Sequence, residues 1–112
     1  MVAFIISLSM RVISVKTIKL FSHSHKTALQ PLLCWYEEIR KASWKNHNEL
    51  KTQFSNASII TNKRVVFNIH GNHYRLIVDI EYRLGIVFVV WIGSHKDYDR
   101  IDSKTITYVK AN

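Results

Sequence analysis

The sequence predicts an α+β fold in which an N-terminal strand and two to three helices pack on an antiparallel β-meander. Two observations support this prediction. The first half of the chain repeats apolar side chains at helical spacing, whereas the second half holds three apolar runs separated by turn residues. The chain has 112 residues, of which 47% are hydrophobic, and this suits one domain with a modest core.

The chain opens on an apolar, uncharged run over residues 1–9. This run is too short to span a bilayer, which needs about 20 residues. It also lacks the basic region and the cleavage site of a secretory signal. We interpret residues 1–9 as an N-terminal extension whose translation the sequence leaves open, and residues 10–112 as a single domain with Met10 as its working start. A short added strand is the alternative for residues 1–9, and no membrane segment is predicted.

The next elements are a short strand over Met10–Ser14 and a helical segment over Val15–Ser22. Ser24 is the predicted cap of a longer helix that runs to about Ala42. Pro31 either lies in the first turn of this helix or bends it. The predicted apolar stripe of the helix consists of Leu29, Leu32, Leu33, Tyr36 and Ile39.

A short helix is predicted over Ser43–Ser55 and a brief strand over Ala57–Ile60. The meander follows, with turns at residues 70–73 and 83–85, where Gly and Asn accept positive φ. Its three strands are predicted over Arg64–Ile69, Tyr74–Tyr82 and Ile86–Ile92. In the middle strand, alternation puts Tyr74 and every second residue after it on the face that meets the helices. Arg75 and every second residue after it occupy the other face.

The two turns also predict how the strands pair. Asn68 is expected opposite Arg75, Arg64 opposite Asp79, and Arg75 beside Gly93. A slip of one residue would move each side chain to the other face. The polar face of the sheet is then lined by Asn68, Arg75, Trp91, Arg64 and Asp79, with His95 just off its end.

This predicted cluster suits chemistry on a phosphate. The guanidinium of Arg75 can fork onto phosphate oxygens, with a salt bridge to Asp79 or Asp97 as the structural alternative. Histidine changes its charge near neutral pH, so His95 is the candidate general acid or base; capping of a short helical turn is its alternative. Tyr98 lies one helical turn later and could donate to a phosphate or stack on a base, or simply be half-buried.

Charge and composition point to a polyanionic partner. Sixteen Lys and Arg residues against eight Asp and Glu give a net charge of +8. This excess favours nucleic acid, an acidic protein or an anionic surface, and a merely soluble basic surface is the alternative. The single cysteine, Cys34, fits the reducing cytoplasm and is interpreted as buried or unreactive. His23 and His25 have no third ligand, so neither zinc nor any other cofactor is predicted.

Two motifs carry a family resemblance. The segments Val66-Phe-Asn-Ile-x-Gly-Asn-x-Tyr-Arg75 and Gly93-Ser-His-x-x-Tyr-Asp99, with the apolar strand pattern between them, resemble the HigB-type toxins of type II toxin–antitoxin systems. These toxins are a branch of the RelE-like messenger-RNA interferases. The match runs from Met10 to about Asp102. It implies a RelE-like fold and a ribosome-associated, metal-independent endoribonuclease that cleaves messenger RNA by attack of the 2′-hydroxyl. It also implies a cognate antitoxin of the helix-turn-helix, HigA-like type.

The resemblance assigns roles by position. Asn72 and Arg75 match a Gly-Asn-x-x-Arg element, and His95, Tyr98 and Asp99 match a His-x-x-Tyr-Asp element. The predicted catalytic residues are Arg75, His95 and Tyr98. The residues predicted to contact RNA are Lys63, Arg64, Asn68, His70, Asn72, Trp91 and Lys96.

Two departures and one alternative accompany this assignment. Ser94 replaces a usual Thr, and His70 stands where the family often has Lys. The alternative function is a non-catalytic basic module that binds RNA or the ribosome and uses Arg75 and Trp91 only to dock.

Overall fold

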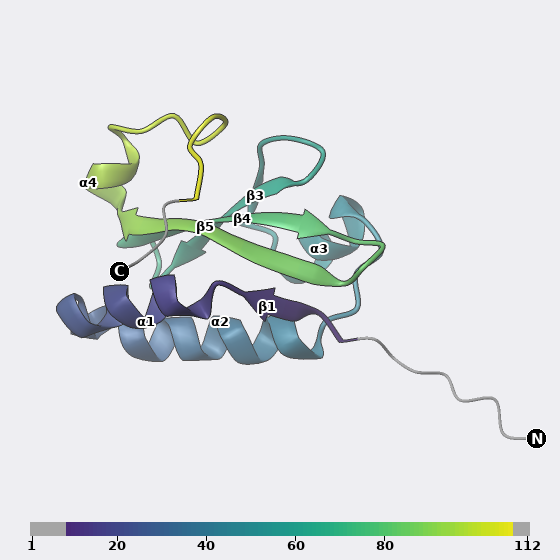
Figure 1. Ribbon diagram of the computed structural model, residues 1–112, viewed down its shortest axis with the longest axis horizontal. Coiled ribbons are helices and arrows are strands. Elements are labelled where there is room, and N and C mark those ends of the chain that lie inside the picture. The colour runs from purple at the N-terminus through teal and green to yellow at the C-terminus, as the bar shows by residue number, and fades with distance from the viewer. Residues whose placement is uncertain (1–8, 109–112) are drawn as a thin grey trace, which may run out of the picture.

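A five-stranded mixed sheet forms the middle layer of the protein, with the strand order β1-β5-β4-β3-β2 (Figure 1). The computed structural model describes residues 9–108. β1 runs parallel to β5, and the other neighbours are antiparallel. The strands are β1 (Arg11–Ile13), β2 (Ser58–Ile59), β3 (Arg64–Ile69), β4 (Tyr74–Glu81) and β5 (Ile86–Ser94). The predicted α+β fold, with its N-terminal strand and its meander, is confirmed.

Helices cover one face of this sheet, and the C-terminal part of the chain covers the other (Figure 1). The helices are α1 (Val15–Ser24), the 3-10 turn η1 (Lys26–Ala28), α2 (Leu29–Lys41), α3 (His47–Gln53) and α4 (His95–Tyr98). α1 and α2 lie under the sheet, whereas α4 and the segment after it lie above it. None of the helices within residues 9–108 has the length and apolar character needed to cross a bilayer.

The predicted N-terminal extension falls, except for Ser9, outside the described residues. Met10, the predicted first residue of the domain, is 3% exposed. Its backbone N–H donates to the carbonyl of Ala42 over 3.0 Å, which ties the start of β1 to the end of α2.

The main core lies between the sheet and the helices, as the alternation in the middle strand predicts. The alternate residues Tyr74, Leu76, Val78 and Ile80 of β4 all belong to this buried cluster. A smaller cluster on the opposite face holds Val66, Ile77 and Val90, against which Ile101 and Ile106 of the C-terminal segment pack. The sheet is therefore buried on both faces.

The predicted stripe of the long helix is wrong in part. Leu32 and Ile39 are buried as expected, but Leu29 and Leu33 are 43% and 47% exposed. Trp35, absent from the predicted stripe, is buried and meets Phe67 edge to face, with 5.6 Å between ring centroids. Burying an indole removes roughly 150–250 Å² from water. That area exceeds what either leucine offers, so the helix turns its tryptophan inward.

The start of this helix also differs from the prediction. Ser24 is the last residue of α1, and η1 follows, so Ser24 does not cap the long helix. α2 begins at Leu29, which puts Pro31 in the first turn. The backbone N–H groups of a first turn have no intrahelical partner, so a proline there costs no helical hydrogen bond.

The predicted pairing of the meander is confirmed around the polar residues. Asn68 pairs with Arg75, Arg64 with Asp79, and Arg75 with Gly93. A bulge then interrupts the β4–β5 ladder, because Ile77 pairs with Trp91 but Val78 pairs with Val89. The extra residue, Val90, reverses the alternation along β5. Trp91 lies before the shift, pairs with Ile77 and therefore lies on the face of Arg75, as predicted.

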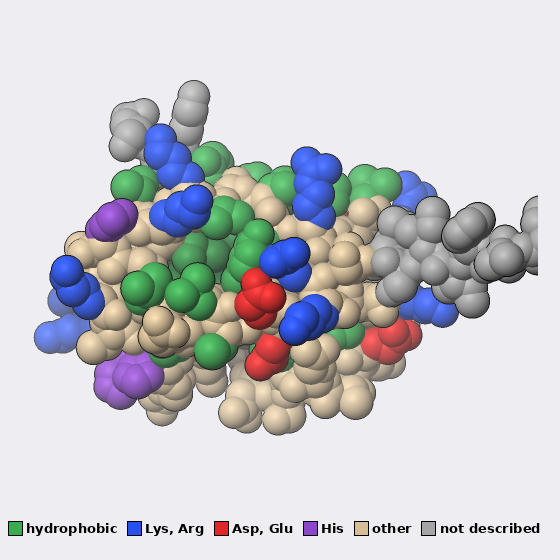
Figure 2. All heavy atoms as spheres, turned by 90° about the horizontal axis from the view of Figure 1, so that it is seen from below, with side chains coloured by type: hydrophobic (Ala, Val, Ile, Leu, Met, Phe, Trp, Pro, Cys, Tyr) green, Lys and Arg blue, Asp and Glu red, His purple; other side chains and the backbone are tan. Residues whose placement is uncertain are grey.

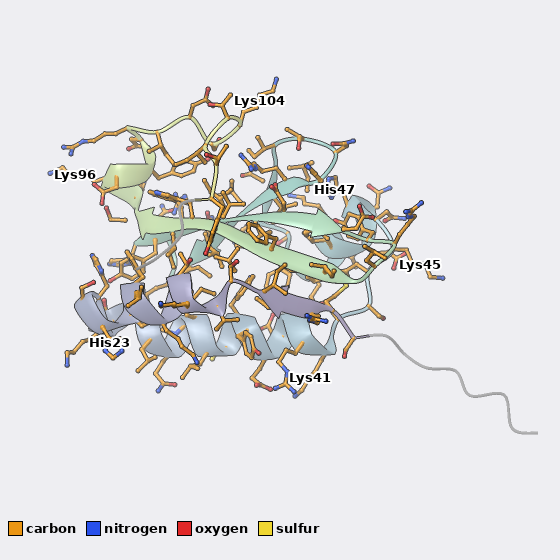
Figure 3. The ribbon with its side chains drawn as sticks, in the orientation of Figure 1. His23, Lys41, Lys45, His47, Lys96 and Lys104 are labelled. Atoms are coloured by element: carbon orange, nitrogen blue, oxygen red, sulfur yellow. The ribbon has the colours of Figure 1, made fainter. Side chains whose placement is uncertain are left out.

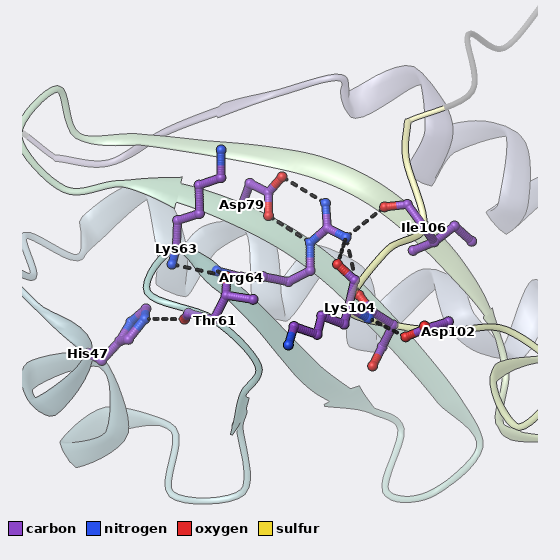
Figure 4. Close-up of polar contacts among 9 residues, drawn as sticks. His47, Thr61, Lys63, Arg64, Asp79, Asp102, Lys104 and Ile106 are labelled. Carbon is purple, nitrogen blue, oxygen red and sulfur yellow. Dashed lines mark hydrogen bonds and ion pairs between the residues drawn. The ribbon is translucent and has the colours of Figure 1, made fainter.

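Arg64 fastens the C-terminal segment across the sheet (Figure 4). Its Nε and Nη2 donate to the two carboxylate oxygens of Asp79 over 2.8 and 2.9 Å. Its Nη1 donates to the backbone carbonyls of Ser103, Lys104 and Ile106 over 3.2, 3.1 and 2.6 Å. The hydrogen bond to Asp79 raises the pKa of Arg64, so the guanidinium keeps its charge.

A second polar link joins α3 to the sheet. His47 Nε2 lies 2.9 Å from the carbonyl oxygen of Thr61, which requires this nitrogen to carry a proton and donate. His47 Nδ1 lies 2.5 Å from the hydroxyl of Tyr82. Burial of Tyr82 raises its pKa from 10.0 to about 12, because the phenolate would lose solvation there.

This shift predicts a loss of stability in alkali. In the unfolded chain the phenol of Tyr82 deprotonates near pH 10.0, and in the folded chain only near pH 12. Between these values the unfolded state binds fewer protons, so the free energy of unfolding falls as pH rises. Tyr82→Phe is expected to be less stable than the wild type at pH 8, with a gap that narrows above pH 10. Denaturant unfolding at several pH values measures this gap.

Tyr108→Phe serves as the matched control, since Tyr108 is exposed. Its difference from the wild type is expected to stay constant over the same range. If the stability difference between Tyr82→Phe and the wild type is also constant from pH 8 to pH 11.5, the raised pKa of Tyr82 is contradicted.

Candidate functional site

The candidate site lies at the end of the sheet where β4 begins and β5 ends. α4 follows β5 without a loop, because the hydroxyl of Ser94 accepts the N–H of Asp97 over 3.1 Å and caps the helix. The backbone N–H of His95 donates to the carbonyl of His73 over 2.9 Å. These bonds hold α4 against the turn between β3 and β4.

Arg75 projects from the first rows of β4 toward α4. Its Nη2 donates to the side-chain oxygen of Asn72 over 3.1 Å, and its Nη1 donates to the carbonyls of Asn72 and Tyr74 over 3.3 and 3.2 Å. Its guanidinium carbon lies 5.9 Å from the centre of the Tyr98 ring. The guanidinium is thus held between the turn and an aromatic face, which suits a cation–π contact.

The charge of Arg75 is not neutralised by a carboxylate. Asp79, one predicted partner, binds Arg64, and the ion pairs found within residues 9–108 do not include Arg75. The salt bridge considered as the alternative role of Arg75 is therefore absent from the part of the chain that the structure describes. A half-buried cation without a counter-charge is suited to bind an anion.

His95 is exposed on the first turn of α4. Its Nδ1 lies 3.4 Å from the carboxylate of Asp99, one turn later on the same helix. This contact orients the ring, and it becomes an ion pair when the imidazole is protonated. Because Asp99 takes Nδ1, Nε2 is the nitrogen available for proton transfer.

Trp91 forms the floor of the site and depends on Gly93. A Cβ atom built on Gly93 would lie 2.4 Å from Cη2 of the Trp91 indole, closer than atoms can approach. The indole therefore lies over the glycine, with its centroid 6.2 Å from that of Tyr98. Trp91 is half-buried, in contact with the second cluster on one side. The role of Gly93 was missed, although a glycine inside a strand often marks such a close approach.

The remaining predicted residues divide into two groups. Asn68 and Asn72 are exposed beside Arg75, and Lys96 is exposed on α4, where Figure 3 labels it. His70 is exposed in the turn before β4, with its ring centroid 4.5 Å from that of His73 and 6.3 Å from that of Tyr74, on the side of β4 that faces the helices. Asn68 and Asn72 also line an adjoining hollow of about 490 Å³.

Lys63 and Arg64 lie elsewhere. They stand at the opposite end of β3 from Asn68, and a rise of about 3.3 Å per residue separates Lys63 from it by roughly 16 Å. The guanidinium of Arg64 is buried and fully engaged by Asp79 and the C-terminal carbonyls. The structure therefore does not bring these two residues to the site.

The described residues contain no group of three His, Cys, Asp or Glu side chains that could hold a metal ion. His25 instead stacks on Phe21, with 3.9 Å between ring centroids. The site consists of one arginine, one histidine with its carboxylate, two aromatic rings and several amides.

The comparison with protein families gives one result. The model of the HigB toxin family, described as the RelE-like toxic component of a toxin-antitoxin system, matches residues 28–101. The match contains β2 to β5, α4 and every residue of the site named above. No curated protein matches the sequence.

Proposed function

Because the chain belongs to the HigB family of RelE-like toxins, we propose that it is an endoribonuclease that cleaves messenger RNA on the ribosome. Membership of a toxin–antitoxin family implies an antitoxin as partner. We further propose that this antitoxin is a helix-turn-helix protein and that the toxin acts in the cytoplasm, where its messenger RNA substrate is translated.

One observation supports the nuclease proposal most strongly. Arg75 presents above Tyr98 a charge that no carboxylate within residues 9–108 pairs with, on the end of the sheet that also carries His95. A guanidinium binds two phosphate oxygens in a fork, and it stabilises the extra negative charge of a pentacoordinate phosphorus. Asn72 holds the side chain in place before the substrate arrives.

The proposed reaction is an internal transesterification. The 2′-oxygen of the RNA forms a bond to the adjacent phosphorus, and the bond from phosphorus to the 5′-oxygen breaks. One proton leaves the 2′-hydroxyl and one is supplied to the departing oxygen, so the products are a 2′,3′-cyclic phosphate and a 5′-hydroxyl. His95 and Tyr98 are the proposed proton-transfer groups. The guanidinium and both proposed proton-transfer groups belong to the protein, so the proposed reaction assigns no step to a metal ion.

The surrounding residues are proposed to hold the RNA. Lys96 on α4 and His70 in the turn before β4 are exposed cationic or titratable groups proposed to contact the RNA. Trp91 offers part of an aromatic face for a base, and Asn68 offers an amide. Lys63 and Arg64 have no part in this proposal.

Ribosome-bound cleavage tests the function directly. Purified protein is incubated with ribosomes that carry a defined messenger RNA, and the ends of the products are mapped. The wild type is expected to cut within the message and leave a cyclic phosphate. His95→Ala is expected to lower the rate by about 10²–10⁴-fold while the protein still sediments with ribosomes.

His23→Ala provides the matched control, because His23 lies on α1, on the other face of the sheet (Figure 3). This variant is expected to cleave like the wild type. If the wild-type protein binds ribosomes but leaves the message intact, the non-catalytic docking module is favoured instead.

A further inference from the structure

An apolar groove runs between α1 and α2, on the face of the protein opposite α4. It has a volume of about 440 Å³, and its lining includes Val15 and Lys19 of α1 and Leu29, Leu33 and Tyr36 of α2. Figure 2 views this face and shows hydrophobic side chains gathered near its middle, with Lys and Arg side chains around them and Asp or Glu side chains at one border. The site described above lies on the other side of the sheet (Figure 1).

Leu29 and Leu33 are not part of the surface through which α2 packs on the sheet. α2 packs on the sheet through Leu32, Trp35 and Ile39, whereas Leu29 and Leu33 leave 43% and 47% of their surface in water. Contiguous exposed apolar surface on a small protein marks an interaction site more often than scattered single residues do. Here the exposed leucines line a concave surface between two helices, and this shape accepts the apolar side of a third helix.

We propose that this groove binds an acidic amphipathic helix of the antitoxin. The groove itself supplies the charge preference, because its lining contains Lys19 and His23 and no carboxylate. Arg40, one turn beyond Tyr36, lies 5.7 Å from the centre of that ring. Its partner Glu37 is more than half exposed and forms only a surface ion pair. Acidic side chains flanking an apolar stripe would meet these cations at the rim.

The same charges argue against a second copy of this chain. A symmetric dimer through the groove would bring together two copies of a lining that contains Lys19 and no carboxylate. Each copy also carries a net charge of +8. Like charges brought together at an interface weaken it, so a partner of opposite charge fits better.

The identity of the partner rests on the proposed function, but the binding surface can be tested separately. The probe is a fluorescently labelled 18-residue helical peptide with leucine on one face and glutamate on the other. The control probe has lysine in place of glutamate. The wild-type protein is expected to bind the acidic peptide and to bind the basic one at least ten-fold more weakly, as measured by fluorescence anisotropy.

Two kinds of variant locate the binding. Leu33→Glu is expected to lower the affinity for the acidic peptide at least ten-fold. Leu84→Glu, the matched control, changes an exposed leucine in the turn between β4 and β5 and is expected to change nothing. Lys19→Glu is expected to lower the affinity for the acidic peptide and to raise the affinity for the basic one. This reversal cannot come from misfolding.

The outcomes separate this proposal from the nuclease proposal. Leu33→Glu is expected to cleave ribosome-bound message like the wild type. Normal cleavage with no peptide binding, or with equal binding of both peptides, overturns the groove proposal alone. Peptide binding as expected without any cleavage overturns the nuclease alone. Sedimentation that shows a dimer, converted to monomer by Leu33→Glu, would assign the groove to a second copy and overturn the proposal.

Discussion

Arg75→Ala is expected to lower the rate of messenger-RNA cleavage by about 10²–10³-fold, the effect of removing a preorganised donor from a developing oxyanion. The reason is the charge of the guanidinium, which Asn72 holds above Tyr98 and which forms no ion pair in the described part of the chain. Its bonds within the protein go to an amide and to backbone carbonyls, so alanine leaves no buried carboxylate unpaired. Stability should therefore change little while catalysis falls.

Two comparisons sharpen this experiment. Arg75→Lys keeps the charge but loses the planar fork, so an intermediate rate is expected. Arg83→Ala removes an exposed arginine from the turn at the far end of β4 and should leave the rate unchanged. The cleavage rate of each of the three variants is measured from the product ends that it generates on ribosome-bound message. An Arg75→Ala protein that is folded and cuts at the wild-type rate would refute the proposed role.

Arg64→Leu is expected to have the largest effect on stability. The substitution leaves the carboxylate of Asp79, which is 23% exposed, without its two donors. It also removes the donor shared by three carbonyls of the C-terminal segment. Breaking a buried pair costs 3–5 kcal/mol, and the partial exposure of Asp79 places this case at about 3 kcal/mol. Denaturant unfolding at pH 7 measures the loss.

A second substitution tests the cause of that loss. Adding Asp79→Leu to Arg64→Leu removes the stranded carboxylate, so the double variant should be more stable than the single one. Arg40→Leu breaks the exposed pair with Glu37 and should cost at most about 1 kcal/mol. If Arg64→Leu cost no more than Arg40→Leu, the central position of Arg64 in the fold would be refuted.

Local patterns in the sequence predicted the sheet well. The strand over Arg64–Ile69 and the pairing of Asn68 with Arg75 follow from alternation and from a turn containing Gly71. Gly71 adopts a φ of 61°, which an L side chain rarely takes. These features depend on residues close together in the chain. The juxtaposition of Arg75 with α4 followed from the same pairing.

α2 and Arg64 show features that local sequence patterns did not predict. Leucines at 29, 32 and 33 fit two neighbouring stripes of the same helix, and only the space available to Trp35 selects between them. The sequence predicted that Arg64, at the start of a strand, contacts RNA. Its burial depends on Asp79 and on carbonyls about forty residues further along the chain.

The α+β class, the meander and the meeting of Arg75 with α4 at one end of the sheet were predictable from local sequence, because alternation and turn chemistry act over a few residues. The tertiary structure was needed to show that a bulge at Val90 interrupts β5, that Gly93 makes room for the indole of Trp91 and that Arg64 is internal. Each of these depends on a bulge or on contacts between distant segments. Their energies arise from packing and desolvation, which no local pattern encodes.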